Sequence, residues 1–275
     1  MKISIQGYEG SFHQIAAEKY FGGEIEIVPC ATFREVTLAV ENGSVNAGIM
    51  AIENSIAGSI LPNYALLQNP SLTVTGEVYL SIEQNLLGVK GASIADIKEV
   101  ESHPMALLQC LNFLEDNIKG VRMVESADTA LSAKDVALRG DKSVAAIASR
   151  RAAELFGLEI LAPNINTVKV NYTRFLVIEQ SDKVILHTNA NKASLYFKVS
   201  HERGTLLEAL SVFEDKNINM SKLQSYPIPT DPFRYLFHVD VEFEGLERFR
   251  ECVDELRSHT EDFCICGIYV SNILK

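Results

Sequence analysis

The chain has 275 residues, 47% of them hydrophobic and 22% charged, which is an ordinary globular composition with enough length for two domains. The formal net charge of −11 argues against a nucleic-acid-binding protein, because such proteins need a basic surface to replace the counterions of the phosphates. The net charge does not exclude the binding of small anionic ligands, since the local field of a pocket can oppose the net charge.

The N-terminus and the cysteines predict a cytoplasmic protein. The first residues hold no apolar stretch long enough for a signal peptide, and no segment has the uncharged apolar length of a membrane span. The five cysteines are odd in number and scattered, which favours reduced thiols. Cys264 and Cys266 have the wrong spacing for a zinc knuckle or a redox CxxC pair, so we expect packing residues, and we predict no metal and no cofactor.

The first 180 residues alternate apolar strand patterns with helical patterns, which is typical of a mainly parallel, doubly wound α/β sheet. At the start of the chain we predict strands at 2–6, 25–29, 47–52 and 72–80, and helices at 11–21, 32–42 and 58–68. Ser11 directly follows Gly10 at the start of a helical pattern, which predicts that it is an N-cap.

A second set of elements continues this alternation. We predict strands at 85–89, 99–102, 121–124, 143–147 and 173–179, and helices beginning at Pro104 and covering 126–138 and 149–156. Proline suits a first helical position because its missing N–H would be unpaired there anyway. Two α/β lobes, 1–80 with 160–180 and 81–159, suggest a ligand cleft between them.

A separate C-terminal domain is predicted at 192–275, after a linker at 181–191. Its strands are expected at 192–200, 219–226, 235–243 and 263–270, and its helices at 204–215 and 247–258. The second and third strands flank a turn that contains Pro227, Pro229 and Pro232. The resulting βαββαβ order is typical of a ferredoxin-like split βαβ fold.

Two strand-to-helix turns in the first 180 residues suit an anionic ligand. The turn at 7–13 contains two glycines, and its free backbone N–H groups would point at an anion beside a helix N-terminus. Taken alone, such a turn is more often structural, because glycine simply permits positive φ. Glu53, Asn54 and Ser55 end a buried strand at the carboxyl edge of the sheet, where open α/β sheets bind ligands. One of the three can equally be an ordinary N-cap.

The segment at 102–104, Ser-His-Pro, repeats this design at the start of a helix that carries Gln109. His103 has a side chain that titrates near neutrality and can serve as a general acid or base. A lone histidine before a helix is more often a cap or an exposed residue, and we weigh that reading above catalysis.

The segment at 171–175, Asn-Tyr-Thr-Arg-Phe, opens the returning strand. The planar guanidinium of Arg174 matches a carboxylate, and the hydroxyl of Thr173 can donate a proton to a departing oxygen. Phe175 can pack against the site and exclude water. A surface Thr-Arg pair on an edge strand is an equally good reading of this segment alone.

Together these segments resemble prephenate dehydratase, with matches at 10–12, 53–55, 102–104 and 173–175 that are collinear over residues 1–180. The C-terminal domain is similar to an ACT regulatory domain. The resemblance implies a two-lobed, periplasmic-binding-protein-like (type II) catalytic domain followed by a ferredoxin-like ACT domain. It also implies a carbon–oxygen lyase of phenylalanine biosynthesis that converts prephenate to phenylpyruvate without a cofactor.

The resemblance assigns catalytic roles to Thr173, as the acid that protonates the leaving hydroxyl, and to Arg174. The residues it implies in substrate binding are Ser11, Glu53, Asn54, Ser55, Ser102, His103, Gln109 and Phe175. Met105 stands where the family commonly has glutamine, so one polar contact is expected to be absent.

For the ACT domain the resemblance implies feedback control by L-phenylalanine and a homodimer or homotetramer formed through these domains. The implied effector residues are Gly204, Thr205, Leu206, Leu207, Gln224, Ser225 and Pro227. They depart from the Gly-Ala-Leu and Glu-Ser-Arg-Pro motifs of phenylalanine-binding members, which leaves the affinity and the identity of the effector open.

Three other readings compete with this one. An arogenate dehydratase would act on the amino-acid counterpart of prephenate. A solute-binding protein would share the two lobes without chemistry, and a non-catalytic ACT sensor would leave the ordered polar segments unexplained. No helical segment precedes Met1, so we expect no fused chorismate mutase.

Overall fold

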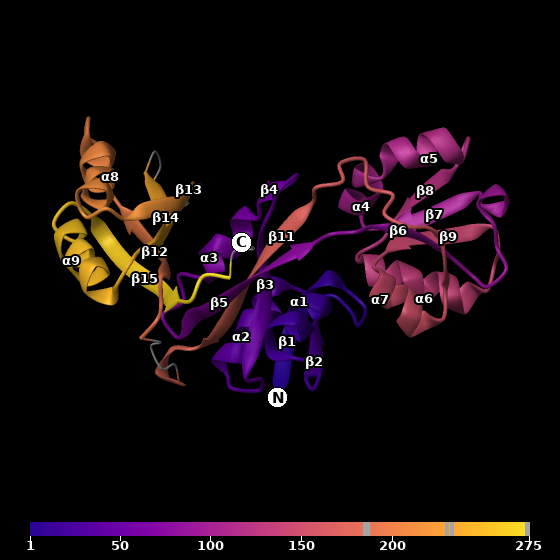
Figure 1. Cartoon of the computed structure of the whole chain (residues 1–275), viewed down its shortest axis with the longest axis horizontal. Helices are drawn as coiled ribbons and strands as arrows, with labels where there is room; N and C mark the ends of the chain where they lie inside the picture. Colours follow the sequence, from indigo (N-terminus) through magenta and orange to yellow (C-terminus); the bar gives the residue numbers. More distant parts are fainter. Residues whose placement is uncertain (184–187, 229–230, 232–233, 273–275) are drawn as a thin grey trace. The chain divides into compact units, whose positions relative to one another are not determined.

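A computed structural model describes residues 1–183, 188–228, 231 and 234–272 (Figure 1). Pro229 and Pro232 of the predicted turn, and 184–187 of the predicted linker, lie outside the described residues. Contacts divide the chain into two compact units. Unit 1 comprises Met1–Val36, Ile49–Gly58 and Tyr79–Phe175, and unit 2 comprises Thr37–Gly48, Ser59–Val78 and Leu176–Lys275. No helix among the described residues combines the length and the apolar character needed to cross a membrane.

The first sheet has the strand order β2 (Glu26–Cys30), β1 (Lys2–Gln6), β3 (Ala47–Asn54), β11 (Tyr172–Gln180) and β5 (Leu72–Ser81), with β4 (Gly58–Ser59) paired to β3. The helices of this part are α1 (Phe12–Phe21), α2 (Phe33–Glu41) and α3 (Leu61–Leu66). The predicted helix at 58–68 is too long, because Gly58 and Ser59 form β4. Pro62 lies in the first turn of α3, the helical position that proline tolerates best.

The second sheet is mixed, with the order β10 (Glu159–Ala162), β6 (Asn85–Gly88), β9 (Val144–Ala148), β7 (Glu99–Ser102) and β8 (Arg122–Glu125). Strand β7 is parallel to β8 and β9, whereas β6 is antiparallel to β9 and to β10. Its helices are α4 (Pro104–Gln109), α5 (Leu111–Asn117), α6 (Thr129–Arg139) and α7 (Arg150–Phe156). Successive residues of β9 pack into two different clusters, one with α4 and α5 and one with α6 and α7, so this sheet is covered on both faces.

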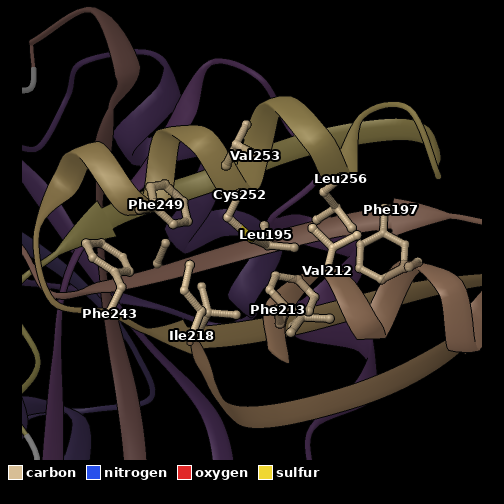
Figure 2. Close-up of a cluster of buried hydrophobic side chains, with 14 residues drawn as sticks. Leu195, Phe197, Val212, Phe213, Ile218, Phe243, Phe249, Cys252, Val253 and Leu256 are labelled. Atoms are coloured by element: carbon tan, nitrogen blue, oxygen red, sulfur yellow. The ribbon is translucent and has the colours of Figure 1, made fainter. Parts of the chain in front are cut away.

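The third sheet has the order β13 (Asn219–Pro227), β14 (Tyr235–Glu242), β12 (Lys192–Lys198) and β15 (Glu261–Tyr269). With α8 (Thr205–Asp215) and α9 (Leu246–Leu256) it forms the predicted βαββαβ order, which we call the C-terminal module (192–272). Figure 2 shows its core, where Leu195 and Phe197 of β12 pack with Phe213 of α8 and Phe249 of α9. These β12 residues alternate with polar ones, so the helices cover only one face of the sheet.

The five cysteines are free; three are buried, and Cys110 and Cys252 belong to hydrophobic clusters. Burial raises the pKa of the Cys110 and Cys252 thiols to about 12, so both stay protonated at neutral pH. Cys266 is buried in β15, which agrees with the predicted packing role.

Candidate active site

Asn54, the last residue of β3, connects two of the predicted site segments through its side chain. Its Nδ2 donates to Oδ1 of Asn171 at 2.7 Å and to Oγ1 of Thr173 at 2.9 Å. Its Oδ1 accepts from the backbone N–H groups of Ile56 at 3.0 Å and Ala57 at 2.9 Å. Because two backbone donors face Oδ1, the orientation of the amide is fixed and its NH₂ group must face Asn171 and Thr173.

This contact occupies one lone pair of the Thr173 oxygen and leaves its O–H available to donate to a further group. Thr173 is the second residue of β11 and is buried. Its oxygen already accepts an N–H from Asn54, which stabilises negative charge that grows on Oγ1 as the proton leaves. The arrangement therefore suits a hydroxyl that gives up its proton during a reaction.

Asn171 extends the network toward the second sheet. Its side chain is fully buried, its Oδ1 accepts from Asn54, and its Nδ2 donates to Oε1 of Gln109 at the end of α4 at 3.1 Å. The sequence pattern assigned no role to Asn171. Strand alternation could have placed Asn171 in the site, because residues 171, 173 and 175 fall on one side of an extended segment.

Ser55 fixes the beginning of β11 through two hydrogen bonds with Tyr172. Its backbone N–H donates to the Tyr172 carbonyl at 2.8 Å, and its Oγ accepts from the Tyr172 N–H at 2.9 Å. Four of the predicted residues are thus brought together by hydrogen bonds around β11: Asn54, Ser55, Gln109 and Thr173.

Arg174 and Glu53 are adjacent in the chain to residues of this network, but their side chains point to the opposite face of the sheet. Successive strand residues point to opposite faces, so Arg174 leaves the face of Thr173, and Glu53 leaves the face of Asn54. Arg174 is buried, and its Cζ lies 6.0 Å from the ring centroid of Tyr79, a cation–π contact that holds the guanidinium.

Three predicted binding residues have structural partners. Ser11 is the predicted N-cap of α1, and its Oγ accepts from the backbone N–H three residues on at 3.4 Å. His103 is the N-cap of α4, where its Nδ1 accepts from the Met105 N–H at 3.2 Å, which confirms the capping alternative. Ser102 donates its hydroxyl to the Ile147 carbonyl at 2.6 Å and ties β7 to β9.

Phe175 is buried against the ring of His13, with the two centroids 5.0 Å apart and the planes at 84°. The His13 ring also lies 5.4 Å from the ring of Phe33. Burial lowers the pKa of His13 to about 4, so this imidazole is neutral at pH 7. The three rings form an apolar cluster directly beside the Thr173 segment.

The glycine turn between β1 and α1 approaches the start of α7 and the start of α6. A Cβ on Gly10 would lie 3.1 Å from Cα of Ala152, and Ser149 Oγ donates to the Gly10 carbonyl at 2.7 Å. A Cβ on Gly7 would lie 2.7 Å from Oδ2 of Asp128. Both glycines have positive φ, so backbone conformation and space each require them. Burial raises the pKa of the Asp128 carboxyl, which caps α6.

The C-terminal module holds a cavity of about 460 Å³, here called the effector cavity. It is lined by Gly204, Thr205, Leu206 and Leu207, together with His201, Arg234, Tyr235 and Phe237, which the sequence reasoning missed. Gln224, Ser225 and Pro227 lie on β13 and do not line it. The Arg234 guanidinium pairs with Glu261 and donates to the Val199 carbonyl at 3.2 Å. In the described part of the chain, no group of three or more His, Cys, Asp or Glu side chains is arranged to hold a metal ion.

Comparison with known families and curated proteins gives one consistent result. The family model for prephenate dehydratase matches residues 3–183. Arogenate dehydratase/prephenate dehydratase 1 of Arabidopsis thaliana is 37% identical over 290 residues, covering 100% of this chain and 73% of that protein. Prephenate dehydratase of Methanocaldococcus jannaschii is 34% identical over 266 residues, covering 95% of each.

Two solved structures are similar over nearly the whole chain. GqqA, described as a novel type of quorum quenching acylase, has a TM-score of 0.90 at 31% identity and covers 99% of both chains. Prephenate dehydratase from Arthrobacter aurescens in complex with L-Phe has a TM-score of 0.89 at 22% identity, covering 98% of this chain and 90% of that one. The second likeness concerns the fold alone, and it confirms the predicted α/β fold class.

Proposed function

The chain belongs to the prephenate dehydratase family of carbon–oxygen lyases, and we propose that it converts prephenate to phenylpyruvate, carbon dioxide and water. We assign the reaction to residues 1–180 as a two-lobed catalytic domain in a cytoplasmic protein. Arogenate is the alternative substrate, because the Arabidopsis relative carries both names.

The reaction asks little of the protein beyond orientation and one proton. The bond from the ring to its carboxylate breaks and its electrons enter the ring. The bond from the ring to the hydroxyl oxygen breaks as well, and that oxygen leaves as water once it has received a proton. Aromatisation of the ring supplies the driving force. One positioned acid at the leaving oxygen is therefore the central requirement.

The observation that carries the proposal is the 2.9 Å hydrogen bond from Asn54 Nδ2 to Thr173 Oγ1. Thr173 donates its proton to the leaving hydroxyl, and the Asn54 amide stabilises the charge that develops on Oγ1. The acidity of threonine is too low for an alkoxide to accumulate, so proton transfer to the leaving oxygen accompanies bond cleavage, and Oγ1 regains a proton from solvent. Such positioned acid catalysis typically contributes about 10²–10⁴-fold.

The neighbouring residues orient the substrate and its charges in this proposal. Arg174 faces away from Thr173 and contacts Tyr79, so we assign to it a substrate carboxylate remote from the leaving hydroxyl. Gln109 and Asn171 keep the Asn54 amide in place. The charge on the ring carboxylate disappears during the reaction, so the apolar rings around Phe175 favour the step, and the neutral His13 adds no opposing charge.

The likeness to GqqA brings an acylase forward as a second candidate. Cleavage of an amide by a hydroxyl nucleophile needs a base that takes the proton of that hydroxyl. The Asn54 amide instead donates to Thr173, which supports the acid over the nucleophile.

We further propose that the C-terminal module is an ACT domain, part of a domain at 192–275, which binds L-phenylalanine in the effector cavity. The apolar lining from Leu206, Leu210 and Phe237 suits an aromatic side chain, and Arg234 lies at the same cavity for a carboxylate. Pairing of these domains would give the homodimer or homotetramer expected for the family.

The test measures product formation from prephenate, from arogenate and from an N-acylated amide, with the wild type and with Thr173→Ala and Thr173→Ser. We expect turnover of prephenate, a loss of about 10²–10⁴-fold in the alanine variant, and partial activity in the serine variant, which keeps the hydroxyl. Circular dichroism checks that both variants are folded. Turnover of arogenate alone would change the substrate, and turnover of the amide alone would replace the proposal with the acylase.

A further inference from the structure

The face of the third sheet opposite its helices is polar and nevertheless buried. Across β12 and β14, Lys192 stands opposite Glu242, and Ser194 stands opposite Asp240. Lys192 is 1% exposed, Ser194 5% and Asp240 7%. An antiparallel sheet covered by helices on one side commonly leaves its other face in water. The polar face of the C-terminal module must therefore be covered by another part of unit 2.

That cover is Ser59–Val78, a continuous segment of the same compact unit, here called the docking segment. The Tyr64 ring of α3 lies 5.0 Å from the His238 ring of β14. Thr73 of β5 donates its hydroxyl to the Cys266 carbonyl at 3.0 Å. The docking segment therefore contacts both β14 and β15 of the module.

A buried ion pair attaches the docking segment to β12. Lys192 Nζ lies 3.0 Å from Oε1 of Glu77, and the two side chains are 1% and 0% exposed. Ser271 Oγ and the Asn272 N–H also donate to this oxygen, at 3.2 and 3.3 Å. Lys192 lies 3.5 Å from Glu242 as well. Separation of the pair would leave uncompensated charge in a buried place, so the contact resists opening.

A second attachment links the start of the docking segment to β13. Lys222 Nζ donates to Oγ of Ser59 at 2.8 Å. The docking segment is therefore held near each of its ends, by Ser59 at the start and by Glu77 close to the finish.

Both ends of the docking segment continue directly into the candidate active site. Asn54 and Ser55 precede Ser59 by a few residues in the chain, and Tyr79, which contacts Arg174, follows Val78. Within the module, β14 connects the effector cavity with the polar face. Its residues Tyr235 and Phe237 line the cavity, and the alternate residues His238 and Asp240 lie on the polar face. β14 thus meets the effector cavity on one face and the docking segment on the other.

We propose that the docking segment, attached through the Lys192–Glu77 pair, transmits ligand binding in the effector cavity to the Asn54–Thr173 network. This inference rests on the proposed function, since it specifies how that site is regulated. Glu77 and Lys192 act as positioning residues, because neither is among the residues assigned to the reaction. Coupling of this kind is reciprocal, so a substrate analogue in the active site also changes the affinity of the effector.

The experiment compares full-length wild type with the double variant Lys192→Met/Glu77→Gln, which removes both charges at nearly constant volume. Calorimetry measures L-phenylalanine binding, and hydrogen exchange with and without L-phenylalanine follows the amides of Ile56 and Ala57, which donate to Asn54. In the wild type we expect L-phenylalanine to change exchange there and to change turnover by about 5–150-fold. In the double variant L-phenylalanine still binds, while its effect on turnover falls to within about twofold and the exchange response disappears.

The matched control is Lys216→Met/Glu255→Gln. Lys216 directly follows α8 and lies 2.9 Å from Glu255 of α9, on the helical side of the same module. We expect it to leave the L-phenylalanine response unchanged. A merely structural role for the Lys192–Glu77 pair would weaken L-phenylalanine binding and its effect on turnover together.

Three results would overturn the inference: no L-phenylalanine binding to the wild type, binding without a response at Ile56 and Ala57, or a full response in the double variant. The failure of the proposed function is a separate result, namely no turnover of prephenate or arogenate by the wild type. Hydrogen exchange still decides the inference in that case, because it needs no catalysis.

Discussion

Each of the two compact units contains a buried polar network, and the two are built from different chemistry. In unit 1, Asn54, Asn171 and Thr173 are joined by neutral amides and a hydroxyl. In unit 2, Lys192 and Glu77 are joined as opposite charges. The free-energy cost of burying neutral groups is lower, and their hydrogen bonds have defined directions, which suits the orientation of one proton donor. Charges are costly to bury alone, which suits an attachment that must stay closed.

The largest effect should come from removing one member of the charged network. Lys192→Met leaves Glu77 buried without its cation, so we expect the free energy of unfolding to fall by about 3–5 kcal/mol. The double variant Lys192→Met/Glu77→Gln should lie much closer to the wild type. Urea unfolding at pH 7 measures the wild type, Lys192→Met, Glu77→Gln and the double variant. Additive losses in the double variant would show that the two side chains are not coupled.

The neutral network should show its main effect in activity. Asn54→Asp keeps an oxygen for the N–H groups of Ile56 and Ala57 but removes the N–H donated to Thr173. We expect kcat to fall by about 10²–10³-fold with a small change in KM, as for loss of one preorganised donor. Steady-state kinetics on prephenate provides the measurement. An aspartate variant with wild-type kcat would contradict the role of the Asn54 amide.

His238 tests the pH tolerance of the covered face. Its pKa is lowered to about 4 by burial against an unfolded value near 6.5, so the unfolded chain binds the extra proton first. The stability is fully present above about pH 6.5 and is lost as the pH falls toward 4, by roughly 3 kcal/mol in total. His238→Phe should remove this part of the acid dependence and keep the ring contact with Tyr64. The prediction would be contradicted if the free energy of unfolding fell equally in the wild type and in His238→Phe between pH 7 and pH 4.

The smallest effect is expected at Asp128. Burial raises the pKa of its carboxyl, so ionisation costs stability as the pH rises through the folded-state pKa, and the cost is absent below the unfolded one. Asp128→Asn keeps the cap of α6, whose N–H groups at Ala130 and Leu131 donate to Oδ1. We expect a small gain in stability at pH 7 and none in acid, measured by thermal unfolding. A loss at pH 7 would mean that the charge itself is stabilising.

The fold was largely predictable because its patterns are local. Alternation along β12 and β14 separates core residues from polar ones, and the βαββαβ order follows from it. The strand β10 was not predicted, since its four residues at the sheet edge carry little pattern. The predicted start of a helix at Ser126 was wrong by a few residues, because Asp128 offers the oxygen that two backbone N–H groups reach.

The candidate site was predictable only in part, because partners distant in the chain decide the role of each polar residue. Asn54 and Thr173 stand at strand ends, which a sequence pattern can indicate. Ser102 looks equivalent in the sequence, yet its hydroxyl is engaged by the carbonyl of Ile147 on another strand. Asn171 gains its role from Gln109 on a helix of the other sheet, which no local pattern contains.

Gly267 of β15 sets a rule for exchanging C-terminal modules between relatives. A Cβ at this position would lie 2.0 Å from the carbonyl oxygen of Val74 on β5, far closer than a non-bonded carbon and oxygen can approach. A module transplanted from another protein can therefore settle on this docking segment only if it brings glycine to the same place. The absence of a side chain at position 267 therefore limits which C-terminal modules can pack on this docking segment when parts of distant family members are recombined.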